Sequence, residues 1–166
     1  MIITVDGLEA ARAGLDKLMA KERFTRAIRL ALRAGKAHGR GRVKSRYTAK
    51  NPLSLGAIRI RASGLKGEMR ISGARNLIKK FRLSPSTRPP HNPPGGLFVQ
   101  IVHGQGGWLR HAFLGMKRPG VYERTSKKKY PIKRLNTLAL PGMFSYFGDE
   151  ISNEMLKRLE AEIGGV

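Results

Sequence analysis

The first residues of the chain carry a helix-start signal followed by leucines at helical spacing. Asp6 is a good N-cap residue, and Glu9 stands three positions later, where it completes a capping box. Leu15 and Leu18 then fall on one face of a helix. The pattern predicts a short helix over residues 7–19.

A second amphipathic pattern begins at Lys21 and has an apolar face and a basic face. The basic positions are spaced three or four residues apart, so in a helix they form one longitudinal stripe. Each glycine in a helix interior costs about 1 kcal/mol relative to alanine, so the glycines from Gly35 onward predict fraying or a bend. The apolar positions are Phe24, Ala27, Ile28, Ala31 and Ala34, and the basic stripe consists of Arg26, Arg29, Arg33, Lys36 and Arg40.

The stretch after the basic helix alternates apolar and basic residues, as half-buried strands do. Residues 55–61 and 69–72 lie on either side of a turn signal at Ser63 and Gly64. Together they predict a β-hairpin with one apolar face and one arginine face. The apolar face holds Ile58, Ile60, Met69 and Ile71, and the arginine face holds Arg59, Arg61 and Arg70.

Two further hairpins are predicted in the second half of the chain. The first of them joins residues 98–103 to residues 108–116 through a glycine-rich turn. The other joins residues 121–124 to residues 129–134, and Pro131 places its second strand at a sheet edge because proline cannot donate a ladder hydrogen bond.

Between the first and second hairpins the chain is harder to assign. Residues 75–83 fit a helix and an extended segment equally well. Residues 84–97 contain five of the nine prolines and cannot form a regular interior strand or helix. They are expected to form an extended arm or long loop that contacts neighbouring subunits through Arg88, Pro89, Pro90, Pro93 and Pro94.

The end of the chain gives the clearest pattern. Asp149 and Glu150 favour a helix start, apolar residues form a stripe up to Ile163, and Gly164 ends the helix. The order of helices, strands, arm, strands and helix predicts a single α+β domain over residues 1–166. In it, an antiparallel sheet of hairpins packs with a long basic N-terminal helix and an amphipathic C-terminal helix.

The net charge of +22, from 33 basic and 11 acidic residues, is the strongest compositional signal. Residues 23–148 hold 28 of the basic residues and only two acids, Glu68 and Glu123. Solubility needs a net charge of only about 2 to 8 in a small domain, so this excess points to a polyanion or to acidic proteins as partners. The chain has no cysteine and no apolar run near the roughly 20 residues that span a bilayer, so we expect a protein made in the cytoplasm without membrane contact.

Enzymatic chemistry finds little support in the residue pattern. General acid-base and metal-assisted reactions need converging carboxylates, whereas Glu68 is expected as a solvated strand position and Glu123 as an ion pair with Arg124 or a subunit contact. The four histidines show no metal-binding spacing. The glycine-rich segments at residues 39–45 and 104–109 lack required glycines of nucleotide-binding loops and are interpreted as turns. We therefore expect no enzyme, no metal and no cofactor.

The basic and aromatic residues leave several interpretations open. The basic stripe fits a solvated face, a surface for acidic proteins, and a surface for phosphate backbones. Stacking of single-stranded bases would require exposed aromatics, but Phe98, Trp108 and Phe113 lie on expected strands and are assigned to the core. The remaining aromatic cluster is expected to form an apolar plug that packs against a terminal helix or a neighbouring subunit. It consists of Phe144, Tyr146 and Phe147.

The order of these segments resembles the prophage minor tail protein Z family, a group of phage tail-completion proteins. The shared features are a basic helix, a hairpin with alternating basic residues, three short strands, a proline-containing turn before Met143 and a terminal helix. They correspond here to residues 26–44, 57–72, 111–114, 120–124, 130–133, 138–143 and 149–163. Residues 5–9 also resemble the start of a wider group of phage neck proteins, whereas residues 88–94 and 137–140 depart from the family pattern.

The resemblance implies a structural virion protein that completes the head-proximal end of a phage tail and joins it to the head. It also implies copies of the chain in a ring, six by analogy, with the tail terminator, tail tube and head-tail connector proteins and the phage DNA end as partners. Its location would be the neck of the virion, after assembly in the host cytoplasm. The family offers no catalytic residue. The alternative from composition is a free-standing basic nucleic-acid-binding protein.

Overall fold

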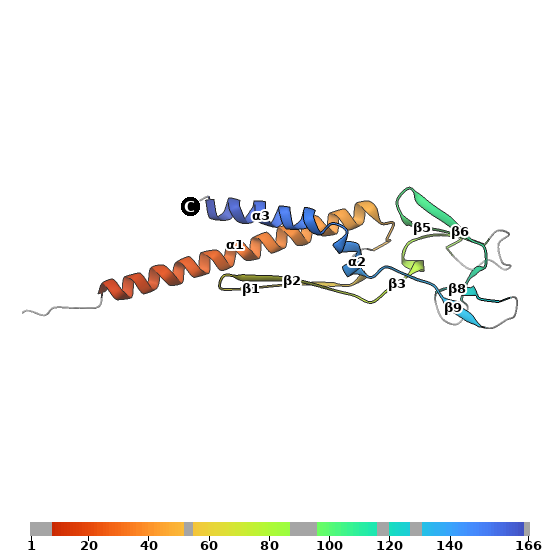
Figure 1. Ribbon diagram of the computed structural model, residues 1–166, viewed down its shortest axis with the longest axis horizontal. Helices are drawn as coiled ribbons and strands as arrows, with labels where there is room; N and C mark the ends of the chain where they lie inside the picture. The colour runs from red at the N-terminus through yellow and green to blue at the C-terminus, as the bar shows by residue number, and fades with distance from the viewer. Residues whose placement is uncertain (1–7, 52–54, 87–95, 116–119, 127–130, 165–166) are drawn as a thin grey trace, which may run out of the picture. The chain divides into compact units, whose positions relative to one another are not determined.

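The computed structural model describes residues 8–51, 55–86, 96–115, 120–126 and 131–164, with side chains from Ala20 onward (Figure 1). The α+β class and the antiparallel sheets expected from the sequence are confirmed. The chain divides into two units, each with its own internal contacts. The first consists of Met1–His38, Ile58–Arg70 and Asp149–Val166, and the second of Gly39–Ala57 and Ile71–Gly148.

A single long helix, α1 (Leu8–Arg46), replaces the two segments expected at the start of the chain. The prediction of a helix ending near residue 19 is wrong, because Ala20, Lys21, Glu22 and Arg23 are all good helix formers and nothing interrupts the backbone. The predicted fraying beyond Gly35 is also wrong, and residues 39–45, interpreted from the sequence as a turn, are helical.

Gly35 remains within the helix, and side chains of the first unit fill the space that a side chain at position 35 would occupy. A Cβ built at Gly35 would overlap Cγ of Met155 and lie 3.4 Å from Cγ2 of Ile151. Both residues belong to α3 (Gly148–Gly164), the predicted C-terminal helix, which runs beside α1 in Figure 1. The cost of glycine in a helix is thus offset by close packing between two helices.

A double-mutant cycle tests this close approach. Gly35→Ala alone is expected to lower the free energy of unfolding by about 1 kcal/mol or more, because the overlap with Met155 exceeds the gain in helix propensity. In a Met155→Ala background the same change is expected to be neutral or stabilising by up to about 1 kcal/mol. Urea unfolding of the four variants measures the coupling. Equal effects of Gly35→Ala in both backgrounds would contradict the packing.

The first predicted hairpin is confirmed as β1 (Ala57–Ser63) and β2 (Lys66–Ser72). Gly64 makes the turn with a φ of 57°, which favours glycine. The hairpin packs on α1 within the first unit: a Cβ at Gly67 would overlap Ile28 and lie 3.0 Å from Cδ1 of Leu32. In addition, the Thr25 hydroxyl donates to the Gly64 carbonyl oxygen at 3.0 Å.

The second unit is built from short antiparallel strands. Residues 75–83, which fitted two assignments, form β3, a 3-10 turn and the start of β4. The described strands of this unit make three small sheets, ordered β4-β5-β6, β7-β8-β9 and β3-β10. Their bounds are β3 Asn76–Leu77, β4 Arg82–Ser84, β5 Leu97–Val102, β6 Gln105–Leu109, β7 Ala112–Leu114, β8 Val121–Arg124, β9 Ile132–Arg134 and β10 Asn136–Thr137; the helix α2 spans Leu140–Ser145.

The second and third predicted hairpins differ in outcome. The second is partly wrong: the strand after the turn runs from Gln105 to Leu109, and residues 112–114 belong to another sheet, where they pair with β8. The third is confirmed, since β8 and β9 are antiparallel neighbours. Pro131 comes directly before β9, which lies at the edge of its sheet within the described strands.

The core of the second unit joins strands of two sheets. Leu83, Leu97 and Val99 from β4 and β5 pack with Ala112 and Val121 from β7 and β8, and Ile78 completes the cluster. Leu97 and Val121 are 1% and 0% exposed. The segment after α1 runs along this sheet. Its Thr48 amide donates a hydrogen bond to the carbonyl oxygen of Ile101 in β5, at 2.9 Å.

Candidate interaction surfaces

The positive charge is concentrated in one of the two units. The first unit contains 14 lysine and arginine residues and 10 acids, whereas the second contains 19 and a single acid, Glu123. Like charges at this density produce a strong positive potential, which raises the rate of encounter with anionic partners. The second unit is therefore the stronger candidate for contact with a polyanion.

Three arginines of the basic stripe are exposed within the first unit. They are Arg26, Arg29 and Arg33, on the side of α1 away from the buried Ala27 and Ala31. Lys36 has a different role, because its ammonium donates to the Ile58 carbonyl oxygen at 3.0 Å and holds the hairpin to the helix. Arg40 is exposed on the part of α1 that belongs to the second unit.

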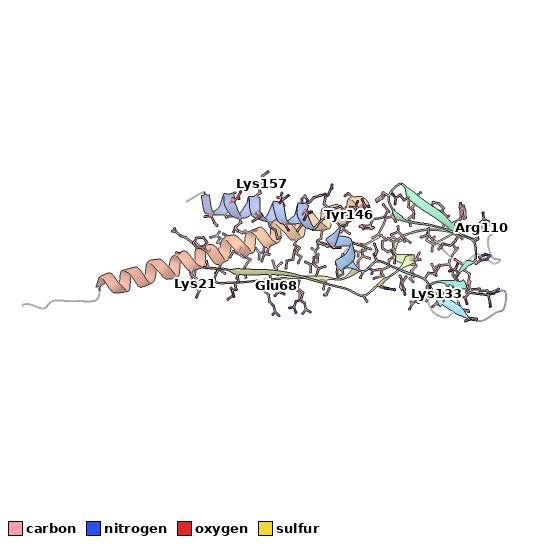
Figure 2. The ribbon with its side chains drawn as sticks, in the orientation of Figure 1. Lys21, Glu68, Arg110, Lys133, Tyr146 and Lys157 are labelled. Carbon is pink, nitrogen blue, oxygen red and sulfur yellow. The ribbon has the colours of Figure 1, made fainter. Side chains whose placement is uncertain are left out.

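The hairpin presents its arginines to solvent, as the alternation predicts. Arg59, Arg61 and Arg70 are exposed, while Ile58 is buried. Glu68 accepts from Nε and Nη2 of Arg70, each at 3.1 Å from Oε1 (Figure 2 labels Glu68). Since both side chains are largely exposed, this pair adds little stability, but it reduces the positive charge around Arg70. Arg59 and Arg61 are therefore the stronger candidates for anion contact on this face.

The aromatic cluster near α2 is mostly internal. Phe144 and Phe147 are 2% and 4% exposed, so their rings belong to the chain's own core. Tyr146 is 60% exposed, and its ring carries the Arg46 guanidinium at 3.7 Å from the centroid. Such a stacked arginine fixes the end of α1 on the segment after α2, both within the second unit. Of the three predicted contact aromatics, only Tyr146 offers exposed surface to a partner.

Trp108 lies outside the core, contrary to the sequence prediction. It is 60% exposed on β6, and its ring meets Phe98 on β5 edge to face, with centroids 5.5 Å apart. Phe98 and Phe113 are half-buried. The sequence pattern could not show this because the two residues before Trp108 are glycines, which carry no apolar or polar signal.

Glu123 and Arg124 do not form the expected local contact. They are neighbours in β8, so their side chains point to opposite faces of the sheet. Arg124 lies over the Phe113 ring at 5.5 Å, and Glu123 is opposite Lys133 in the register of β8 and β9. The one acid of the second unit therefore has a basic cross-strand neighbour.

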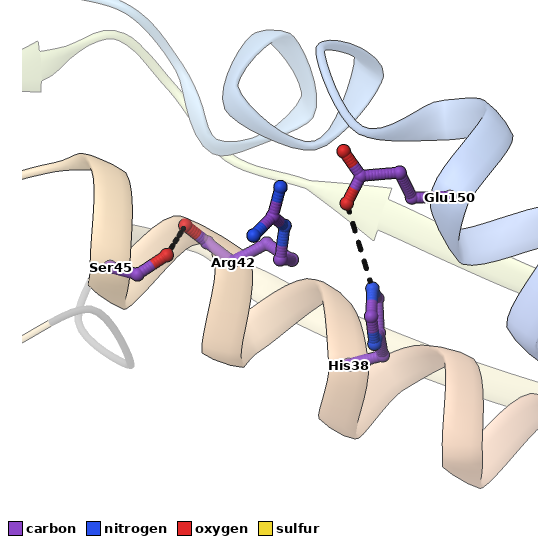
Figure 3. A network of polar contacts seen from close by, with 4 residues as sticks. All are labelled: His38, Arg42, Ser45 and Glu150. Carbon is purple, nitrogen blue, oxygen red and sulfur yellow. Dashed lines mark hydrogen bonds and ion pairs between the residues drawn. The ribbon is translucent and has the colours of Figure 1, made fainter.

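The titratable residues of the described chain do not converge on one site. His38 on α1 faces Glu150 on α3, with Nε2 and Oε2 3.8 Å apart (Figure 3). His103 and His111 lie exposed at two turns. Within the described residues, no three histidines or carboxylates gather where they could hold a metal ion.

The proline arm falls largely beyond the described part of the chain. Its expected contact residues Arg88, Pro89, Pro90, Pro93 and Pro94 lie within residues 87–95, which the structure does not describe. They remain a prediction from the sequence.

Comparisons with known proteins give no relative. No family model, no curated protein and no solved structure matches the chain. Among the described helices, none combines the length and the apolar character needed to cross a bilayer. The assignment of interaction surfaces therefore depends on the chain's own residues.

Proposed function

We propose that this chain is a structural virion protein of a tailed bacteriophage, which completes the head-proximal end of the tail and takes part in joining it to the head. It acts by contact and not by catalysis. It works as repeated copies around the tail axis, beside tail terminator, tail tube and connector proteins, with its basic surfaces toward acidic subunits or the DNA end.

The observation that carries this proposal is the match between the family-like segments and the elements of the fold. Each described segment of the resemblance except residues 138–143 falls on an element of the expected kind, and all of them are in the expected order. The basic segment lies in α1, residues 57–72 are β1 and β2, and residues 111–114, 120–124 and 131–133 lie at β7, β8 and β9. Residues 138–143 were expected as a turn, but residues 140–143 belong to the helix α2, and residues 149–163 lie in α3.

Charge and exposed side chains also support a contact role. A unit with 19 basic residues and one acid attracts acidic subunits or DNA over several ångströms. Tyr146 and Trp108 leave large rings in water, and exposed aromatics of this kind are enriched in protein and nucleic-acid interfaces.

A deletion in the phage that encodes the chain tests the proposal. Lysates are expected to contain DNA-filled heads and separate tails, seen by negative-stain electron microscopy, with a loss of infective particles of about 100-fold or more. A large loss is expected because removing the subunit of a closed ring removes all of its repeated contacts together. Supplying the intact gene in trans should restore joined particles. Normal yields of joined, infective particles from the deletion would overturn the proposal.

The alternative is a free-standing nucleic-acid-binding protein, which the charge of the second unit favours. The discriminating measurement is the affinity of the purified chain for duplex DNA across a salt series. Submicromolar binding that falls steeply as salt rises, together with joined particles in the deletion, would favour this alternative.

A further inference from the structure

The sheet β4-β5-β6 has one face turned to the core and one face turned outward. Side chains alternate along β5, so Leu97 and Val99 enter the core, while Phe98 and Gln100 lie on the opposite face. The same alternation places Leu83 inward and Arg82 outward on β4. The proposed function assigns no ligand to this outward face.

The strand register assembles two rows of side chains on this outward face. Phe98 is paired with both Ser84 and Trp108, which makes an aromatic row. Gln100 is paired with Arg82 and Gly106, and the Arg82 guanidinium donates to Oε1 of Gln100 at 3.3 Å. An aromatic row therefore lies next to a row that carries a cation and an amide.

Gly106 leaves room for the aromatic row. A Cβ at Gly106 would overlap the end of the Phe98 ring, which occupies that space beside the β6 backbone. Trp108 consequently meets Phe98 on one side and stays 60% exposed. Glycine in a strand gives up packing and marks a place where another molecule can approach the backbone closely.

Exposed basic side chains occur on β4 and directly after β6. Arg82 is exposed on the same face, and Arg110 is exposed immediately after β6 (Figure 2). The sheet belongs to the unit that holds 19 basic residues and one acid. A ligand that suits this face is therefore anionic and carries flat apolar surfaces.

We propose that this outward face, made of Arg82, Phe98, Gln100, Trp108 and Arg110, binds single-stranded nucleic acid. Bases stack on Trp108 and Phe98, and phosphates are attracted by Arg82 and Arg110. Stacking on aromatic rings beside a basic surface is the usual mode of binding for unpaired strands. A duplex hides its base faces, and an acidic protein offers charge without them. The inference goes beyond the virion role and stands whether or not that role is correct.

Trp108 is the only tryptophan of the chain, so its fluorescence reports on this face alone. The full chain is titrated with an oligothymidylate of about 12 nucleotides, with a duplex of equal length, with heparin and with polyglutamate. We expect the single strand to quench the fluorescence and to bind more tightly than the duplex. Heparin supplies charge without bases, so it should bind without comparable quenching.

Affinity for the labelled oligonucleotide is measured in parallel by fluorescence anisotropy on variants. Trp108→Ala should weaken binding by on the order of 10- to 100-fold and Trp108→Phe by less, because phenylalanine still stacks. Leu138→Ala is the control, since Leu138 is an exposed apolar residue of the same unit, 52% exposed, and its truncation should leave the affinity unchanged. Circular dichroism verifies that each variant is folded.

Three results would contradict base stacking at Trp108. If the wild-type chain and Trp108→Ala bind the oligonucleotide with equal affinity, or if heparin quenches the fluorescence as strongly as the single strand, the face attracts anions by charge alone. If polyglutamate quenches the fluorescence and the oligonucleotide does not, the ligand of this face is an acidic protein. None of these results bears on the deletion phenotype, so failure here and failure of the virion role are distinguishable.

Discussion

Gly96→Ala is expected to lower the free energy of unfolding of the second unit by more than about 3 kcal/mol. Gly96 has a φ of 86°, a conformation that alanine rarely adopts. Its missing Cβ would also overlap the Leu109 carbonyl oxygen and lie 2.7 Å from Cα of Arg110. These are backbone atoms, so the clash cannot be relieved by a rotamer change. Urea unfolding followed by circular dichroism measures the loss.

Two other glycines of the same sheet supply graded controls. Gly104 has a φ of 76° but open space around its missing Cβ, so Gly104→Ala should cost about 1 kcal/mol from backbone strain alone. Gly107 has open space and no such φ, so Gly107→Ala should be nearly neutral. A Gly96 variant as stable as the Gly107 variant would contradict the close approach of β5 and β6 at this position.

Leu97→Ala is expected to destabilise the second unit by about 2 to 5 kcal/mol. Leu97 is 1% exposed and lies in the cluster that joins β4 and β5 to β7 and β8. Truncation removes buried methyl groups and leaves a cavity among residues of two sheets, so both sheets should lose protection together. Hydrogen exchange at the amides of β5 and β8 separates this result from local fraying.

Leu138→Ala provides the same chemical change at an exposed position. Leu138 is 52% exposed, so its truncation should change the unfolding free energy by no more than about 0.5 kcal/mol. If both leucine variants lose similar stability, the cluster around Leu97 is not the core of this unit.

The elements with a clear side-chain period were predictable from the sequence. The hairpin β1-β2 alternates isoleucine with arginine, and α3 combines acidic residues at its start with glycine at its end, so local signals and packing agree. The continuity of α1 beyond Gly35 was not predictable, because Met155 and Ile151 fill the space above Gly35. That contact joins residues more than a hundred positions apart and leaves no local signal.

Surface residues show a similar limit. The arginines of the basic stripe and the hairpin were assigned correctly to exposed faces because regular spacing defines a face. Trp108 was assigned to the core because an aromatic residue on a strand is usually buried, and its glycine neighbours give no alternation to correct that assignment. Lys36 was grouped with the stripe, although its ammonium binds a backbone carbonyl oxygen of the hairpin. Sequence spacing cannot reveal such a long-range partner.

The uneven division of charge also affects the second unit by itself. Its 19 cationic side chains repel one another, and Glu123 is the only acid there to offset them. An anionic partner that binds the folded unit relieves this repulsion and, by mass action, shifts the equilibrium toward the native state. Binding of such a partner and the folding stability of this unit are therefore thermodynamically linked.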